Sequence, residues 1–171
     1  MMTIREAQPE DADAAIEVVR RSIEELCVAD HRNDPDTLAG WLANKTPQSF
    51  QSWLADPQNF CVVAVVEGRL HGVGLLHREG ELMLFYLSPG MQRRGVGALL
   101  YRALEQKAIQ WGLRMVHLNS TFMARSFYEA LGFQSVGPAK KVFGVLQSYP
   151  YEKSLAPDVS RQPPAADSNR S

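Results

Sequence analysis

The chain has 171 residues, enough for one compact domain with a hydrophobic core of its own. Its apolar fraction of 45% and its charged fraction of 22% are those of an ordinary water-soluble protein. The formal net charge of -1 gives no overall attraction to nucleic acid or to an anionic membrane, so we expect neither as a partner. No segment has the roughly 20 consecutive apolar residues of a membrane span, and the amino terminus is unlike a secretory signal. We therefore predict a cytoplasmic protein.

The chain has two cysteines, Cys27 and Cys61, which are too few for a disulfide framework. Their separation is not that of paired metal ligands, and we expect no metal site. Both are predicted to be small, buried, apolar side chains rather than reactive thiols.

Hydrophobic periodicity divides the chain into helices and strands. Apolar residues at helical spacing predict two long helices, one carrying Ile16 and Val19 and the other carrying Leu100 and Leu104. Apolar runs between turn residues predict strands, and three of these form an antiparallel meander. The predicted elements are, in chain order, a strand (3–8), three helices (9–27, 37–43 and 47–54), three strands (60–66, 70–77 and 81–87), a helix (93–112), a strand (115–118), a helix (124–131) and two strands (133–136 and 142–151).

These elements predict an α+β fold with a mixed, mostly antiparallel twisted sheet of about seven strands flanked by helices. One domain is expected over residues 1–155, with the polar stretch 29–35 irregular in structure. From Ala156 onward Pro, Ala, Ser, Asp and Asn dominate, and no large apolar residue follows Val159. Residues 156–171 are therefore expected to form a disordered tail.

A phosphate-binding turn is predicted where the third meander strand leads into the long helix. The strand ends at Pro89-Gly90, and Gln92-Arg93-Arg94-Gly95-Val96-Gly97 follows. The first amides of a helix have no intrahelical partner, and together with the positive end of the helix dipole they bind anions. Glycine at 95 and 97 lets a diphosphate approach the backbone, and the two arginines add positive charge. The alternative is that the glycines only allow close helix–sheet packing and that the arginines are solvated.

Two other phosphate-binding motifs do not fit this segment. A P-loop needs a Lys-Ser or Lys-Thr pair after its glycines, and none is present here. A dinucleotide-binding motif needs a parallel strand–helix–strand unit, whereas the preceding strands are predicted to be antiparallel.

The segment resembles motif A of the GCN5-related N-acetyltransferase (GNAT) family, (Q/R)xxGx(G/A), at Gln92, Gly95 and Gly97. Residues 124–133, ARSFYEALGF, are similar to a second signature of that family, AxxFYExxGF. The order of the predicted elements also matches, so the resemblance covers about residues 3–153. It implies the acyl-CoA N-acyltransferase fold, with acetyl-CoA as the acetyl donor between the fourth and fifth strands.

The resemblance also implies which residues contact the coenzyme. The backbone of residues 86–88 would pair with the pantetheine arm, and the amides of residues 92–97 would bind the pyrophosphate. Thr121 stands where the family often has asparagine, so Asn119 and Ser120 are candidates for that amide contact. The residues expected at the coenzyme are Tyr86, Leu87, Ser88, Gln92, Arg93, Arg94, Gly95, Val96, Gly97, Asn119, Thr121, Ser126 and Tyr128.

Direct acetyl transfer needs removal of a proton from the amine, a donor to the oxyanion, and an acid or dipole for the departing thiolate. Tyr128 stands where the family commonly has a tyrosine near the coenzyme sulfur, and it is the expected acid; otherwise its ring only packs against the coenzyme. Glu81 lies eleven residues before Gln92, at the offset of the catalytic glutamate in histone acetyltransferases of the family. It is the candidate base, the alternative being a solvated glutamate at a strand end.

Other histidines and the aromatic residues of the short helices leave alternatives open. His71, His77 and His117 could replace Glu81 as the base, although strand histidines are usually structural. The acceptor pocket is expected to be lined by residues 27–54 and the last hairpin, with His31 as a candidate acceptor contact. The aromatic residues Trp41, Phe50 and Trp53 are either helix core or, if they face the cleft, a sign of an apolar acceptor.

The resemblance therefore predicts an acetyl-CoA-dependent N-acetyltransferase acting on a primary amine of a small molecule. The alternatives are transfer to a protein or peptide amine, and a non-catalytic acyl-CoA-binding module with a regulatory role. Dimers are frequent in the family, so a homodimer is a further hypothesis.

Overall fold

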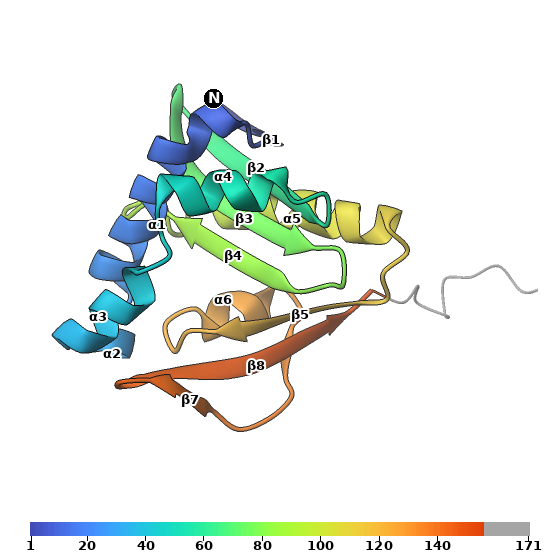
Figure 1. Cartoon of the computed structure of the whole chain (residues 1–171). Coiled ribbons are helices and arrows are strands. Elements are labelled where there is room, and N and C mark those ends of the chain that lie inside the picture. The colour runs from blue at the N-terminus through green and yellow to red at the C-terminus, as the bar shows by residue number, and fades with distance from the viewer. Residues whose placement is uncertain (156–171) are drawn as a thin grey trace, which may run out of the picture.

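The computed structural model describes residues 1–155 and contains two four-stranded sheets with helices packed against them (Figure 1). The first sheet has the order β1 (Met2–Glu6), β2 (Asn59–Val66), β3 (Arg69–His77) and β4 (Leu82–Leu87). In the second, β8 (Leu146–Ser154) pairs with β5 (Met115–Ser120), β6 (Gln134–Ser135) and β7 (Lys140–Phe143). All of these pairings are antiparallel. The predicted tail, residues 156–171, lies outside the described residues.

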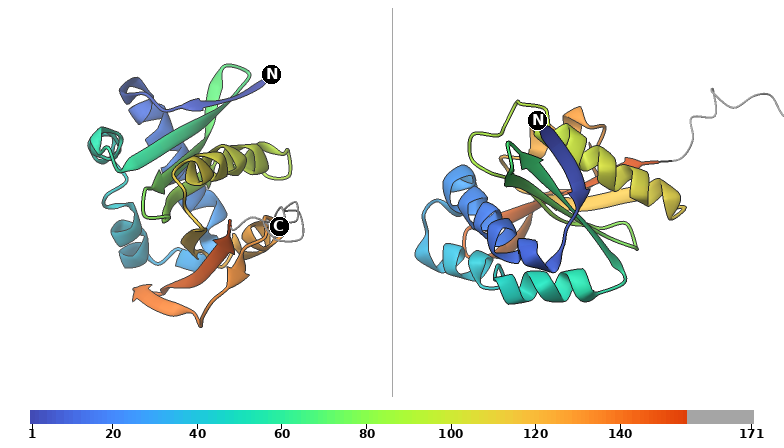
Figure 2. Two further views of the ribbon diagram at one scale, coloured as in Figure 1. Left: turned by 90° about the vertical axis from the view of Figure 1, so that its right-hand side faces the viewer. Right: turned by 90° about the horizontal axis from the view of Figure 1, so that it is seen from above.

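Helices cover both faces of the first sheet (Figure 2). A short 3-10 turn (Pro9–Asp11) precedes α1 (Ala12–Leu26), and then come α2 (Val28–His31), α3 (Pro35–Leu42), α4 (Pro47–Ala55), α5 (Val96–Gln110) and α6 (Arg125–Ala130). Helices α1 and α4 lie on one face and α5 lies on the other. No helix within residues 1–155 is long and apolar enough to cross a membrane.

Each face of the first sheet has its own core. Ile16, Val19 and Ile23 of α1 pack with Val73 and Leu75 on one side. On the other side, Leu100 and Leu104 of α5 pack with Val62, Ala64 and Leu76. Strand β2 is apolar throughout its middle because both of its faces are buried. Helix α5 comes so close that a Cβ added at Gly74 would lie 2.6 Å from Leu104 Cδ1.

The two sheets meet at one end of the β4–β5 pair. There Glu81 and His117 form a single parallel bridge, and the His117 N–H donates to the Gly80 carbonyl at 3.0 Å. Beyond this bridge β4 and β5 belong to separate sheets. The structure therefore has an opening between its fourth and fifth strands.

Three parts of the chain differ from the predicted elements. Helix α5 begins at Val96 instead of Arg93, because Arg93 (φ 63) and Gly95 (φ 82) are left-handed and cannot continue a helix. The single strand predicted over 142–151 is the hairpin β7–β8, which turns at Gly144 (φ 53). The stretch 29–35, expected to be irregular, contains most of α2 and the first residue of α3. The described residues 1–155 consequently contain eight strands where about seven were predicted.

The β7–β8 turn is tied to α3 by a chain of hydrogen bonds. The Val145 N–H donates to Thr37 Oγ1 at 3.0 Å, and that hydroxyl donates to Asp34 Oδ2 at 2.6 Å. The same Asp34 carboxylate caps α3 by accepting the Thr37 N–H at 3.0 Å. These bonds join the second sheet to the helices that follow α1.

Candidate functional site

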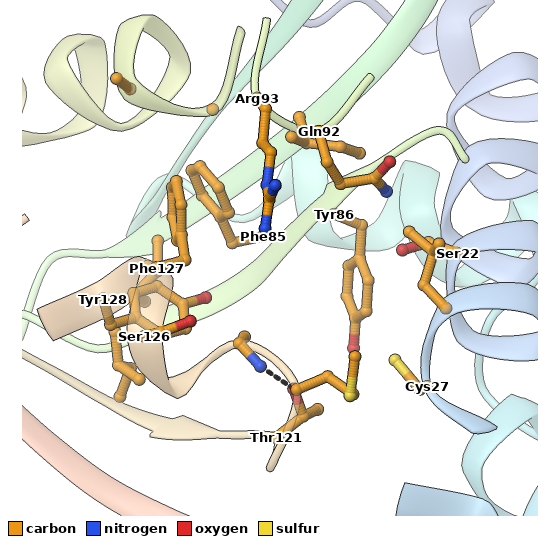
Figure 3. Close-up of a pocket in the computed structure, with 18 of the residues that line it drawn as sticks. Ser22, Cys27, Phe85, Tyr86, Gln92, Arg93, Thr121, Ser126, Phe127 and Tyr128 are labelled. Atoms are coloured by element: carbon orange, nitrogen blue, oxygen red, sulfur yellow. Dashed lines mark hydrogen bonds between the residues drawn. The ribbon is translucent and has the colours of Figure 1, made fainter. Parts of the chain in front are cut away.

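A cavity of about 730 Å³ lies in the opening between β4 and β5. In Figure 3, one side of the cavity is formed by Ser22 of α1 and by Cys27, which directly follows that helix. The other side is formed by Phe127 and Tyr128 of α6. Gln92 and Arg93, from the turn before α5, lie at one end. A cavity of this size, with a mostly apolar lining and a few polar groups, is typical of small-molecule sites.

The cavity collects most of the residues predicted at the coenzyme. Three of them, Ser88, Arg94 and Val96, do not line it. Ser88 is buried and its N–H donates to the His71 carbonyl at 2.8 Å, while Val96, the first residue of α5, is buried in the core. The predicted residues that line the cavity are Tyr86, Leu87, Gln92, Arg93, Gly95, Gly97, Asn119, Thr121, Ser126 and Tyr128.

The turn before α5 has the geometry of an anion site. Gln92 Oε1 accepts the Gly90 N–H at 3.0 Å, which holds the turn in place. The helix makes its first hydrogen bond from the Leu99 N–H to the Gly95 carbonyl at 3.2 Å. The N–H groups just before Leu99 therefore have no intrahelical partner, and they point out of the positive end of the helix dipole. The exposed side chain of Arg93 lies beside them at the cavity.

The two glycines of the turn have different roles in the structure. Gly95 is left-handed, and apart from its own neighbours in the chain no atom of residues 1–155 lies within 4 Å of the position that a Cβ would occupy. A Cβ at Gly97 would instead lie 2.9 Å from Cε2 of Phe127. Gly95 thus leaves open space beside the free amides, whereas Gly97 is required for the close packing of α5 on α6.

Tyr128 is buried in an aromatic cluster at the wall of the cavity. Its ring centroid lies 5.3 Å from that of Phe127, 5.6 Å from that of Phe133 and 6.2 Å from that of Phe85. Burial raises the pKa of Tyr128, with smaller contributions from the facing Tyr86 and Cys27. The hydroxyl therefore remains a neutral proton donor at physiological pH.

Tyr86 and Cys27 line the same cavity opposite Tyr128. Burial is the main cause that raises the pKa of Tyr86, and a hydrogen bond with Trp41 partly opposes it. Burial also raises the pKa of the Cys27 thiol to about 12, with a further contribution from the nearby Asp30. Cys27 and Cys61 are both buried, as predicted. The three weakly acidic groups that face one another, Tyr86, Cys27 and Tyr128, are therefore all neutral.

Glu81 lies at the closed end of the opening and does not line the cavity. It directly precedes β4, it is exposed, and its backbone forms the bridge to His117. His71, His77 and His117 also lie outside the cavity lining. Within residues 1–155, no three His, Cys, Asp or Glu side chains are placed together to hold a metal ion.

Thr121 holds the turn that leads into α6. Its hydroxyl accepts the Ala124 N–H at 3.1 Å, the dashed line in Figure 3. Helix α6 begins at Arg125, so this bond closes the turn just before the helix. Asn119, on β5, is exposed at the same wall of the cavity.

The expected acceptor-side residues occupy the core instead of the cavity. His31 is fully buried, with Nε2 3.0 Å from the Ile23 carbonyl and Nδ1 accepting the Asn33 N–H at 3.0 Å. Both ring nitrogens are thus engaged, which corrects the expectation that His31 contacts an acceptor. Trp41 and Phe50 are also buried, so the alternative that they are helix core is confirmed. Of residues 27–54, Cys27 alone lines the cavity, and the last hairpin does not reach it.

Two features of the site were not predicted from the sequence. One is the wall formed by Ser22 and Leu26 of α1. The other is Asp30, whose buried carboxylate accepts the Phe122 N–H at 2.7 Å and the Met123 N–H at 3.4 Å. These partners are 92 and 93 residues away in the chain, so no local pattern indicates the contact.

Comparisons with known proteins agree on one family. Residues 24–155 match the family model described as an acetyltransferase (GNAT) domain. Three mycobacterial relatives, described as uncharacterized N-acetyltransferases of Mycobacterium bovis and of two Mycobacterium tuberculosis strains, are 30% identical over 138 residues. These alignments cover 74% of this chain and 85% of each relative.

Solved structures show the same fold. A GCN5-related N-acetyltransferase from Rhodopseudomonas palustris has a TM-score of 0.79 at 23% identity, covering 90% of this chain and 95% of that chain. PaiA N-acetyltransferase from Thermoplasma acidophilum, solved with coenzyme A, has a TM-score of 0.75 at 20% identity and coverages of 90% and 99%. An aminoglycoside 6'-N-acetyltransferase, also complexed with coenzyme A, has a TM-score of 0.69 at 15% identity and coverages of 91% and 98%.

Proposed function

The chain belongs to the GCN5-related N-acetyltransferase (GNAT) family and is an N-acetyltransferase, and we propose that it transfers an acetyl group from acetyl-CoA directly to a primary amine of a small molecule. The observation that carries this proposal is the cavity between β4 and β5. It joins the anion-binding turn before α5 and the buried Tyr128 in one space. Coenzyme A in two solved structures of the same fold supports the choice of donor.

The coenzyme is proposed to lie with its pyrophosphate at the turn of residues 92–97. The free amides there, with Arg93, supply donors and positive charge for the phosphates. The pantetheine arm would then follow the edge of β4 that faces the opening. Because the Ser88 N–H points toward β3, strand alternation directs the backbone groups of Phe85 and Leu87 to that free edge. These groups are the proposed partners of the pantetheine amides.

In the proposed transfer the amine nitrogen attacks the thioester carbonyl carbon. A C–N bond forms and the C–S bond breaks, so the nitrogen gives up one proton and the coenzyme sulfur takes one. Tyr128, neutral and facing the cavity, is proposed to donate the proton to the sulfur. Glu81 is exposed and outside the cavity lining, so it remains only a predicted base that would have to act through water.

The test is release of free coenzyme thiol from acetyl-CoA in the presence of a panel of amines. Tyr128→Phe should lower kcat by about 100-fold, the usual scale of a lost general acid, while the KM for acetyl-CoA changes little. Tyr149→Phe is the matched control, because Tyr149 lies outside the cavity lining and should retain wild-type kcat. A wild-type kcat in the Tyr128→Phe variant would show that Tyr128 is not the general acid.

The panel also separates the other hypotheses. If peptides accelerate thiol release and none of the small amines does, a protein or peptide acceptor is favoured. Binding of acetyl-CoA with no acceleration by any amine would favour the non-catalytic module. The cytoplasmic location and the homodimer stay predictions.

A further inference from the structure

The lining of the cavity carries an inference about the acceptor that rests on the proposed function. We propose that the acceptor is an amine with an apolar body and no second positive charge. Polycationic amines, such as polyamines and aminoglycosides, are then poor substrates. The acceptor is assigned to the side of the cavity formed by the end of α1 and the middle of β4.

This side of the cavity lies away from the anion-binding turn. In Figure 3, Tyr86 extends from β4 away from Arg93 and toward Cys27, and Ser22 of α1 lies on the same side of the cavity as Cys27. Leu26 and Met123 complete the wall. With the phosphates of the donor at the Arg93 end, these residues are left for the acceptor.

No carboxylate lines the cavity within the described residues 1–155. Asp30 is the buried acid near it, but its oxygens are occupied by the Phe122 and Met123 N–H groups. The one charged residue of the lining in that part of the chain is Arg93, and it lies at the donor end of the cavity, where it offers an ammonium group no counter-charge. A second ammonium group entering this space would lose its hydration and find no counter-charge, which is costly in an apolar site.

The same surroundings suit the reactive amine itself. Burial among apolar groups favours the neutral form of an amine, and the neutral form is the nucleophile. Hydroxyls of Tyr86 and Ser22 at this wall can hydrogen-bond to the nitrogen without a charge of their own. After attack the nitrogen loses one proton and the sulfur of the coenzyme gains one. Because the number of protons is conserved, the residues of the wall do not have to be charged for the transfer.

The first experiment compares acceptors in the thiol-release assay. Hexylamine and phenethylamine should have kcat/KM values at least about tenfold above those of spermidine and kanamycin, because each tenfold step corresponds to about 1.4 kcal/mol and a lost counter-charge exceeds that. Equal values, or a preference for the polycations, would overturn the inference.

Calorimetric binding to the coenzyme A complex gives a readout that does not need turnover. Hexylamine should bind more tightly than spermidine. If no amine releases thiol but this order of binding holds, the proposed function fails and the inference stands. If spermidine binds more tightly, the inference fails whether or not the enzyme transfers acetyl groups.

Matched variants introduce the missing charge. The measured quantity is kcat/KM for spermidine divided by kcat/KM for hexylamine. This ratio should be about tenfold higher in Leu26→Glu than in Leu26→Gln. Glutamine has nearly the same size as glutamate but carries no charge. Leu26 is half-buried, so Met123→Glu against Met123→Gln repeats the comparison at a residue that is 52% exposed. Equal ratios within both pairs would contradict the proposal.

Discussion

At the scale of single residues, Asp30 is the side chain that joins the helices after α1 to the loop before α6. The residue is 5% exposed, and its carboxylate serves as acceptor for two backbone N–H groups. Asp30→Ala should lower the free energy of unfolding by about 2–3 kcal/mol at neutral pH, because it leaves the Phe122 and Met123 N–H groups without an acceptor. Urea unfolding measures this change.

The hydrogen bonds of the Asp30 carboxylate stabilise the fold, whereas the burial of its charge at neutral pH destabilises it. The two effects on the free energy of unfolding have to be separated. Burial raises the pKa of Asp30, while the two N–H groups and the positive charge of Arg125 partly lower it. A raised carboxyl pKa stabilises the fold at pH values below the ordinary pKa, and this contribution is lost as the pH rises through the folded value. Asp30→Asn keeps one acceptor oxygen without the charge and should cost less than Asp30→Ala. An alanine variant as stable as wild type would contradict the bridging role.

At the scale of elements, the junction of α5 with α6 depends on the missing side chain at Gly97. A Cβ there would lie 2.9 Å from Phe127, whose ring stacks on Phe85 with centroids 5.4 Å apart. Gly97→Ala should therefore lower the free energy of unfolding by about 1–3 kcal/mol, as overpacking does elsewhere. The measurement is denaturant unfolding, with and without Phe127→Leu in the same chain.

The paired substitution separates packing from backbone effects. Phe127→Leu shortens the side chain against which the added methyl group would press, so Gly97→Ala should cost less in that background. The same cost in both backgrounds would show that the glycine serves the backbone and not the packing.

At the scale of the whole molecule, the two sheets are joined by one bridge within the described residues, Glu81 to His117, and diverge around the cavity. A coenzyme lying in the opening would contact both sheets. Coenzyme A at 100 times its Kd should thus stabilise the fold by about 2.7 kcal/mol. Thermal unfolding measures the stabilisation, and hydrogen exchange should slow in β5 and β8 as well as in α5.

The control for this prediction is Gly95→Val. The new side chain would occupy the open space beside the free amides, so the same concentration of coenzyme should give a smaller thermal shift relative to the unliganded variant. Slower exchange confined to α5, or an undiminished shift in Gly95→Val, would contradict a ligand that spans the opening.

Predictions from the sequence succeeded for elements whose conformation is determined by their own residues. The spacing of apolar residues and the turn residues between them predicted strands β2 to β4 and helices α1, α3 and α4. The buried face of each of these elements can be recognised from the positions of its own apolar residues. The start of α5 was wrong by three residues, because Arg93 adopts a left-handed conformation that its residue type does not indicate. The β7–β8 hairpin was missed because its turn is held by Thr37, 108 residues away in the chain.

By itself the sequence determined the family and the place of the turn before α5, because motif A and the AxxFYExxGF signature are short local patterns. The tertiary structure decided which side chains share the cavity. It assigned Gly97 to packing and Gly95 to open space, placed Glu81 outside the lining, and brought Ser22 and Cys27 opposite Tyr128. These outcomes depend on how α1, α6 and the two sheets pack against one another, and such contacts between distant segments leave no periodic or local signal.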